Sequence, residues 1–190
     1  MAEAVTTFIL GGQRSGKSRR AEMLARQWID ASTQHRAVMI ATGQAGDDEM
    51  RERIARHQAD RAQRVPGMAT VEEPLALAEA LRRHSDAHTL IVVDCLTLWL
   101  TNLMMPADPA QARDDGAVVA AGASLCAAIA AAPGPVVLVG NEIGLGVIPM
   151  GREVRAFVDA LGRLNQQVAQ ACERVTLMAA GLPLTLKDTP

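Results

Sequence analysis

The segment Gly11–Ser18 contains the residue types that proteins use to bind the phosphates of a nucleotide. It reads Gly-Gly-Gln-Arg-Ser-Gly-Lys-Ser and matches the pattern G-x-x-x-x-G-K-[ST]. Glycines let backbone amides turn toward phosphate oxygens, and the helix that follows adds its positive N-terminal end. Lys17 would neutralise the β- and γ-phosphates, and the Ser18 hydroxyl would ligate Mg2+. The candidate phosphate-binding residues are Gly11, Gly12, Gln13, Arg14, Ser15, Gly16, Lys17 and Ser18.

A glycine turn that merely precedes a helix is the alternative interpretation of this segment. However, an apolar strand is expected just before it and a helix just after it, which is the context that a phosphate loop requires. Lys17 is also one of only two lysines in the chain, and it occupies the position that the pattern demands. The sequence therefore favours a nucleotide-binding site.

A carboxylate at the end of a second apolar strand is the usual companion of such a loop. The run Thr89–Asp94 reads Thr-Leu-Ile-Val-Val-Asp, so Asp94 directly follows a buried strand. In phosphate-loop proteins a carboxylate at this place holds Mg2+, often through water. Apolar strands that end in Asp are common, and a plain cap of the strand end is the alternative. Taken with the phosphate loop, Ser18 and Asp94 are predicted as the metal ligands.

His57 lies on a third segment that could do chemistry. In a helix that begins near Asp47, the side chains of Met50, Ile54 and His57 share one face, because their spacing is i, i+4 and i+7. This spacing alone favours a half-buried histidine that completes an apolar stripe, and the arginines around it could form a solvated face. A neutral imidazole near a bound triphosphate is also a plausible nucleophile at phosphorus. The residues themselves leave both interpretations open.

These candidate residues need elements that bring them together, and the chain alternates short apolar runs with longer helical patterns. The alternation predicts a single α/β domain over residues 1–190, with a P-loop NTPase-like, mostly parallel sheet and helices on both faces. Strands are expected at Thr6–Leu10, Ala37–Ala41, Leu90–Asp94, Val136–Val139 and Val175–Met178. Helices are expected at Lys17–Ala31, Asp47–Ala62, Leu75–His84, Ala117–Ala132 and Arg152–Cys172, with a loop at Pro106–Gly116.

The composition is that of a soluble globular protein and excludes several classes of function. Of the 190 residues, 49% are hydrophobic and 21% are charged, and a net charge of -2 gives no overall attraction for nucleic acid. The most apolar window, residues 90–105, contains Asp94 and is too short for a membrane span. The three cysteines include no C-x-x-C pair, which favours a reducing compartment, so a cytoplasmic protein is expected.

Several further segments match one known family over roughly residues 8–181. The most specific are Asp47–His57 and Asn141–Pro149, and the others are Gly11–Ser18 with Ala21-Glu22, Ile40–Thr42, Thr70–Pro74, Asp94–Thr97, Thr101–Leu103 and Gly162–Gln166. On these residues the chain resembles the bifunctional adenosylcobinamide kinase / adenosylcobinamide-phosphate guanylyltransferases of cobalamin biosynthesis.

The resemblance implies an enzyme that is both a kinase and a nucleotidyltransferase. Such enzymes phosphorylate the aminopropanol hydroxyl of adenosylcobinamide with ATP or GTP. They then transfer GMP from GTP to the new phosphate through a guanylylated histidine, which releases pyrophosphate and gives adenosylcobinamide-GDP. His57 matches this histidine, so His57 and Lys17 are the candidate catalytic residues. The resemblance also implies Mg2+ as cofactor, adenosylcobinamide and its phosphate as partners, and a homotrimer.

The resemblance assigns further residues to the nucleotide site, outside the phosphate loop. They lie at the end of the second expected strand, directly after the candidate histidine, and at two acidic positions. These residues are Ala41, Thr42, Gly43, Gln58, Ala59, Asp60, Arg61, Glu72 and Asp94.

Two other functions share the phosphate loop. A single-activity P-loop kinase acting on another small alcohol needs Lys17, Ser18 and Asp94 but no reactive histidine, so a covalent nucleotide adduct would exclude it. A GTP-binding switch that acts through a protein partner predicts slow hydrolysis and no dependence on a corrinoid.

Overall fold

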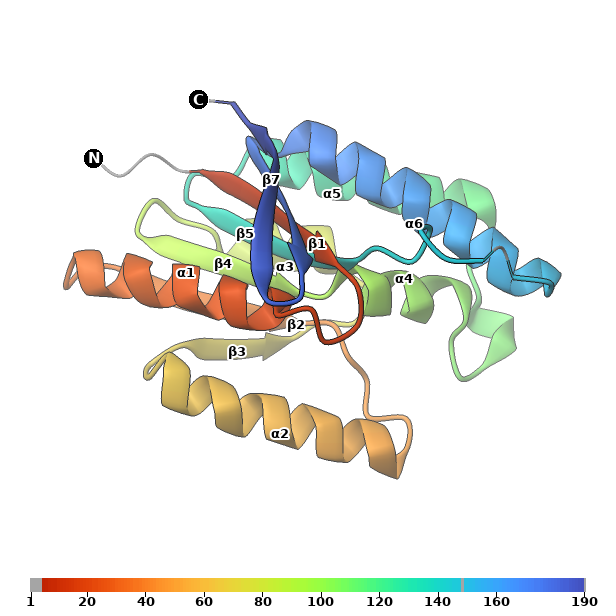
Figure 1. The fold of residues 1–190 in the computed structure, drawn as a ribbon, viewed down its shortest axis with the longest axis horizontal. Coiled ribbons are helices and arrows are strands. Elements are labelled where there is room, and N and C mark those ends of the chain that lie inside the picture. Colours follow the sequence, from red (N-terminus) through yellow and green to blue (C-terminus); the bar gives the residue numbers. More distant parts are fainter. Residues whose placement is uncertain (1–4, 148, 190) are drawn as a thin grey trace.

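The structure, a computed structural model, describes residues 5–147 and 149–189, with the side chain of Arg53 excepted. Within these residues, seven strands form one sheet in the order β3-β2-β4-β5-β1-β6-β7 (Figure 1). All neighbouring strands are parallel except β6 and β7, which are antiparallel. The strands are β1 (Thr6–Gly11), β2 (Arg36–Ala41), β3 (Ala69–Glu72), β4 (Thr89–Asp94), β5 (Val136–Asn141), β6 (Arg174–Ala179) and β7 (Leu182–Asp188).

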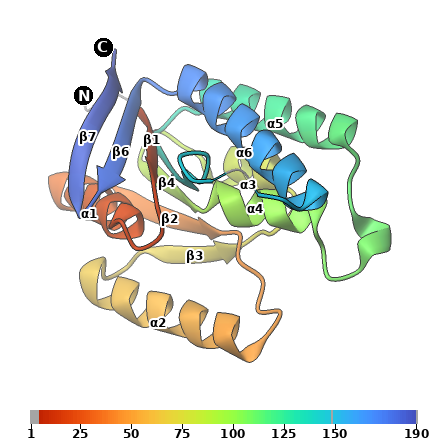
Figure 2. The same cartoon turned by 45° about the vertical axis from the view of Figure 1, so that its right-hand side comes forward.

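Helices cover both faces of the sheet, which confirms the predicted fold class. Helix α1 packs on one face, and α3 to α6 pack together on the other (Figures 1 and 2). Both views show α2 beside β3, near α1 and apart from the other helices. The helices are α1 (Lys17–Ala31), α2 (Asp48–Arg64), α3 (Leu77–His84), α4 (Leu96–Met104), η1 (Pro109–Gln111), α5 (Asp115–Ala130) and α6 (Arg152–Ala171).

The central strands are buried on both faces, as their continuous apolar runs predict. On β1, the side chains of Phe8 and Leu10 belong to the apolar core beneath α3 to α6, whereas Ile9 belongs to the core beneath α1. Successive side chains of a strand point to opposite faces, so a strand between two layers must be apolar at nearly every position. Side chains of these strands that could reach a ligand are therefore expected at and after the strand ends.

Four elements, β3, α4, η1 and β7, were not predicted from the sequence. Strands β3 and β7 lie at the two edges of the sheet and are largely exposed, so they lack the long apolar run of a central strand. Helix α4 is apolar on most sides, which hides the helical period. The predicted loop contains η1, and α5 begins at Asp115 because Asp114 caps it, its side chain accepting from Ala117 N at 2.7 Å.

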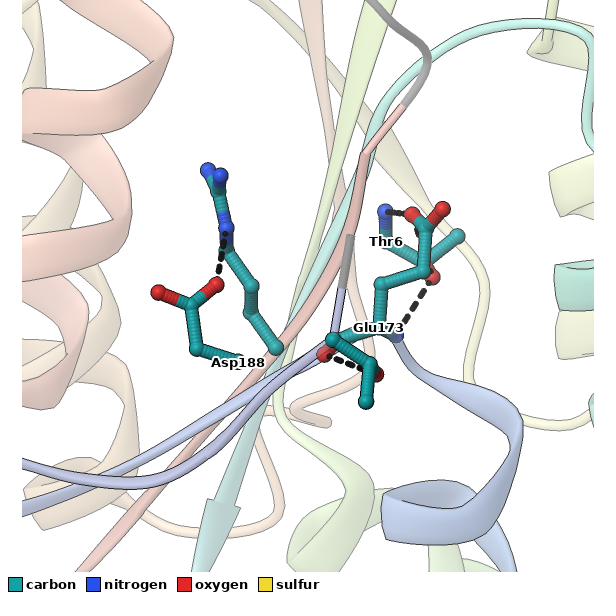
Figure 3. Close-up of polar contacts among 5 residues, drawn as sticks. Thr6, Glu173 and Asp188 are labelled. Atoms are coloured by element: carbon teal, nitrogen blue, oxygen red, sulfur yellow. Dashed lines mark hydrogen bonds and ion pairs between the residues drawn. The ribbon is translucent and has the colours of Figure 1, made fainter.

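The C-terminal hairpin fastens the start of β1, the strand that leads into the phosphate loop. One carboxylate oxygen of Glu173 accepts hydrogen bonds from Thr6 N at 2.8 Å and Thr6 Oγ1 at 3.3 Å (Figure 3). Arg174 Nε pairs with Asp188 at 2.9 Å across the hairpin, which joins β6 to β7. These contacts hold β1 in register with β6.

Among the described residues, no helix is long and apolar enough to cross a membrane.

Candidate functional site

The phosphate loop links β1 to α1, and its glycines are required by its shape. Gly11 has a φ of 155°, and a Cβ atom there would lie 2.5 Å from the carbonyl oxygen of Met178. Gly16 caps α1 in the left-handed region with a φ of 98°, a conformation that L side chains rarely adopt. The loop is thereby curled at the N-terminal end of α1, the conformation that the sequence pattern requires for binding an anion.

A polar cleft of about 450 Å³ opens beside this loop. The Lys17 ammonium donates a hydrogen bond to Gly12 O at 2.6 Å, which folds the side chain back over the loop. Ser15 Oγ is buried and has no hydrogen-bond partner among the described residues. An oxygen of a bound phosphate would satisfy this hydroxyl, because a buried polar group without a partner is costly. The cleft is lined by residues 13–19 and by Glu49, Glu52, Arg56, His57, Asp60, Arg64, Asp94, Cys95, Val139 and Asn141.

A second, smaller pocket of about 110 Å³ lies on the other side of His57. Its walls are mostly apolar, with the polar groups of Arg61 and Glu72 at its edge. The two pockets share four residues, so His57 stands on the wall between the phosphate cleft and this pocket. The shared residues are Ser18, His57, Asp94 and Cys95, and the others of the second pocket are Met39, Ala41, Gly43, Met50, Ile54, Gln58, Arg61, Glu72 and Leu98.

Four residues assigned to the nucleotide site from the sequence line neither of these two pockets. Thr42 is buried and joins two strand ends, because its hydroxyl donates to Cys95 O at 2.7 Å and accepts from Cys95 N at 2.9 Å. Ala59 is exposed on α2. Gly11 and Gly12 supply loop shape and carbonyl groups: Gly11 O accepts from Glu142 N, and Gly12 O accepts from Lys17. Neither glycine has a side chain that could line a pocket.

Asn141 is a cleft residue that was not singled out from the sequence as a site residue. It ends β5 and pairs in register with Gly11 of β1, which places it beside the phosphate loop. Its backbone is fixed by two side chains: Thr97 Oγ1 accepts from Asn141 N at 2.9 Å, and Asn165 Nδ2 donates to Asn141 O at 3.1 Å. A polar residue at the end of a buried strand is the signal that could have found it, but only the strand order shows that β5 neighbours β1.

Helix α2 carries His57 and is tied to α1 by an ion pair near its C-terminal end. Arg64 Nη1 lies 2.7 Å from a carboxylate oxygen of Glu22, whose side chain is 2% exposed. This hydrogen bond raises the pKa of the Arg64 guanidinium. At the other end Asp47 caps the helix and accepts from Met50 N at 2.7 Å. His57 and Arg64 are seven residues apart and so share a helix face, which means that the pair also sets the direction of His57.

Cys95 is the other side chain of the shared wall that could act as a nucleophile. Burial, together with the neighbouring Asp94 carboxylate, raises the pKa of its thiol to about 11. A thiol with so high a pKa stays protonated at neutral pH, and the thiolate is the reactive form. Between these two side chains, the chemistry of the wall therefore favours His57.

Comparison with known proteins gives matches over nearly the whole chain. A family model described as cobinamide kinase / cobinamide phosphate guanyltransferase matches residues 7–186. The bifunctional adenosylcobalamin biosynthesis protein CobP of Pseudomonas aeruginosa is 50% identical over 183 residues, covering 96% of this chain and 98% of that protein. The bifunctional adenosylcobalamin biosynthesis protein CobU of Escherichia coli is 38% identical over 188 residues, covering 95% and 98%.

Two solved structures support the fold alone, because their sequences are distant. A Pyrococcus horikoshii OT3 protein aligns with a TM-score of 0.57 at 8% identity, covering 98% of this chain and 88% of its own. The flagellar accessory protein FlaH of Methanocaldococcus jannaschii aligns with a TM-score of 0.50 at 9% identity, covering 98% and 79%. The arrangement of sheet and helices is thus shared with proteins that have little sequence in common.

Proposed function

The chain belongs to the cobinamide kinase / cobinamide phosphate guanyltransferase family, and on that basis we propose how its residues carry out the two reactions. Membership makes the chain a bifunctional enzyme of cobalamin biosynthesis. It phosphorylates cobinamide from a nucleoside triphosphate and then transfers a guanylyl group to the cobinamide phosphate. The observation that carries the residue assignment is the position of His57 on the wall shared by the phosphate cleft and the second pocket.

In the kinase step, the phosphate loop holds ATP or GTP so that the aminopropanol hydroxyl of adenosylcobinamide attacks the γ-phosphorus. The O–P bond to the new ester forms while the bond to the nucleoside diphosphate breaks. Lys17 moves from Gly12 O to the β- and γ-phosphates and neutralises the charge that develops there. No covalent enzyme intermediate is needed, so His57 has no chemical role in this step.

Ser18 and Asp94 fit a magnesium site. Both are oxygen ligands, and both line the shared wall between the two pockets. Mg2+ commonly takes one or two protein oxygens and completes its octahedron with water and phosphate oxygens. When bound, it would neutralise charge on the triphosphate. The Ser18 hydroxyl, at the first turn of α1, and the Asp94 carboxylate, at the end of β4, are the groups that would hold it.

In the guanylyl step, a ring nitrogen of His57 attacks the α-phosphorus of GTP. An N–P bond forms and pyrophosphate leaves. A phosphate oxygen of adenosylcobinamide phosphate then attacks the same phosphorus, the N–P bond breaks, and adenosylcobinamide-GDP is released with the imidazole regenerated. Two displacements with a good leaving group replace one difficult displacement between two anions. Arg56 lines the cleft and offsets the negative charge of both reactants.

The second pocket suits the guanosine part of GTP in this step. Its apolar wall, which includes Met50, Ile54 and Leu98, can contact a flat base. The Glu72 carboxylate accepts hydrogen bonds, and guanine presents N1–H and N2–H donors, which adenine lacks in that arrangement. Arg61 is held near this pocket because its Nη2 donates to Thr70 Oγ1 at 3.0 Å. These features support guanine specificity at the transfer step.

A labelling experiment tests the role of His57. Wild type and His57→Ala are incubated with α-labelled GTP and Mg2+, and an acid-labile adduct is located by peptide mapping. The matched control is His84→Ala, at the end of α3. We expect label on the His57 peptide in wild type and in the control, and none in His57→Ala, which should keep its kinase activity. Label on another residue, or guanylyl transfer at the wild-type rate by His57→Ala, would show that His57 is not the nucleophile.

A homotrimer and a cytoplasmic location complete the proposal. The trimer rests on the family resemblance, and the mass of the purified protein by light scattering tests it. A reducing compartment is supported by the three free cysteines, of which Cys95 and Cys172 are buried. A single-activity kinase remains the competing function, and the absence of any labelled adduct in wild type would favour it.

A further inference from the structure

The loop between β5 and α6, residues 142–151 with 148 outside the described range, exposes several apolar side chains. Leu145, Val147 and Met150 are 83%, 97% and 95% exposed. A group of exposed apolar side chains on a folded domain usually marks a surface that binds something. The proposed steps of the two reactions do not involve this loop. It nevertheless makes up most of Asn141–Pro149, one of the two most specific segments of the family resemblance.

The loop is anchored at both ends, so this exposure belongs to its folded conformation. At its start Glu142 N donates to Gly11 O of the phosphate loop at 3.1 Å, and Gly144 N donates to Glu142 Oε1 at 2.7 Å. At its end Arg155 Nη1 donates to Pro149 O at 3.0 Å and also to Met150 O. The loop therefore extends the phosphate site outward along the end of the sheet.

A cleft of about 490 Å³ lies between this loop and α6. Ile143, Val147 and Val158 give it apolar walls. Its polar side chains carry charges of both signs: Arg155 and Arg163 are cations, Asp159 is an anion, and the neutral amide of Gln166 accompanies them. Such a lining suits a neutral ligand with hydrogen-bonding groups at its edge, and it is less suited to a polyanion.

The corrinoid ring of adenosylcobinamide, the acceptor of the kinase step, has these properties. A corrinoid is a broad ring with apolar methyl groups and neutral carboxamide arms, and it is too large to share the phosphate cleft of about 450 Å³ with a nucleotide. Its hydroxyl arm must enter that cleft while the ring stays outside. Asn141 lines the phosphate cleft and the loop continues from it, so a ring on the loop would direct its arm to the phosphates.

Resting on the proposed function, we propose that the β5–α6 loop and the cleft between it and α6 bind the corrinoid ring of the acceptor. A second copy of the chain is the competing occupant of this surface. The edge strand β7 presents a separate set of exposed leucines, Leu182, Leu184 and Leu186, and none of them lines the phosphate cleft or the cleft beside α6. Continuity with the phosphate loop favours the acceptor on the β5–α6 loop.

The test compares the double variant Leu145→Ser/Val147→Ser with the matched control Leu184→Ser/Leu186→Ser, two exposed leucines farther along β7. Three quantities are measured: KM for adenosylcobinamide at saturating ATP, the yield of the histidine adduct from GTP without acceptor, and the mass in solution. We expect the loop variant to raise KM for adenosylcobinamide by about tenfold or more, equivalent to about 1.4 kcal/mol. Adduct yield and mass should stay at wild-type values, and the β7 control should keep its KM.

An unchanged KM in the loop variant would overturn the proposal, as would a fall in mass accompanied by loss of both activities, which would assign the loop to a subunit interface. The adduct needs no acceptor, so its absence in wild type would instead refute the role of His57.

A second measurement covers the case in which the double variant does not fold. In Leu145→Cys, adenosylcobinamide should slow the reaction of the new thiol with a maleimide, whereas ATP alone should not. Equal rates with and without the corrinoid would refute the proposal.

Discussion

The ion pair between Glu22 and Arg64 joins the phosphate-loop helix to the helix of His57, and removing Arg64 should damage both stability and guanylyl transfer. The carboxylate of Glu22 is 2% exposed, whereas the side chain of Arg64 is 39% exposed. The substitution Arg64→Ala therefore leaves a charge buried without its partner. The substitution Glu22→Gln leaves an arginine that water can already reach and that still pairs with Asp60 at 2.9 Å.

The expected changes in the free energy of unfolding follow from this difference in exposure between Glu22 and Arg64. Loss of one partner from a fully buried pair costs about 3–5 kcal/mol, and an exposed pair contributes about 0.2–1 kcal/mol. Because Arg64 is partly exposed, we expect Arg64→Ala to lower the free energy of unfolding by about 2 kcal/mol, between these limits. Glu22→Gln should cost about 1 kcal/mol, since the amide can still accept a hydrogen bond. Guanylyl transfer should fall more than kinase activity, because His57 shares the helix face of Arg64.

Urea unfolding at pH 7, followed by circular dichroism, gives the free energies. The matched control is Arg26→Ala, which removes an exposed pair with Asp30 on the same helix as Glu22 and should leave the free energy of unfolding close to that of wild type. Kinase and transfer rates are measured separately on each variant. A cost for Arg64→Ala equal to that of Arg26→Ala, or a larger cost for Glu22→Gln, would show that the burial of Glu22 does not set the cost. Equal losses of the two activities would show that the pair does not direct His57.

Three further predictions concern single groups. Lys17→Ala should abolish kinase activity by several orders of magnitude with the fold intact by circular dichroism, because the β- and γ-phosphates lose their cation, and near wild-type turnover would remove the phosphate-loop argument. Burial raises the pKa of Cys95 to about 11. The contribution of the protonated thiol to the free energy of unfolding is therefore complete below pH 9.0, its ordinary pKa, and is lost as pH rises toward 11. Urea midpoints should therefore fall less between pH 8 and 10 in Cys95→Ala than in wild type, and identical falls would contradict this. The hydrogen bond from Thr89 lowers the pKa of Asp86, so its stabilisation is present above about pH 4 and is lost as pH falls through the lowered value. Acid unfolding should accordingly be less steep in Asp86→Asn, and an unchanged acid limb would show that Asp86 contributes nothing.

The phosphate loop and the helix after it could be predicted from the sequence because everything that they need is contiguous. Eight residues supply the turn, the lysine and the hydroxyl, and α1 spans Lys17–Ala31, as its pattern predicts. The central strands were predictable for a related reason, since burial on both faces demands continuous apolar runs. Strands β3 and β7 follow no such rule, because an edge strand is defined by the neighbour with which it pairs.

The tertiary structure alone decided what surrounds the loop. Spacing on α2 left His57 either an apolar-stripe residue or a nucleophile, and its place between two pockets depends on how α2 packs beside β3 and α1. Glu22 and Arg64 are 42 residues apart, and no local pattern pairs them. Asn141 neighbours Gly11 only because the sheet order sets β5 beside β1. Local sequence determined the conformation of the Gly11–Ser18 loop, whereas long-range strand pairing and helix packing determined the two pockets beside it.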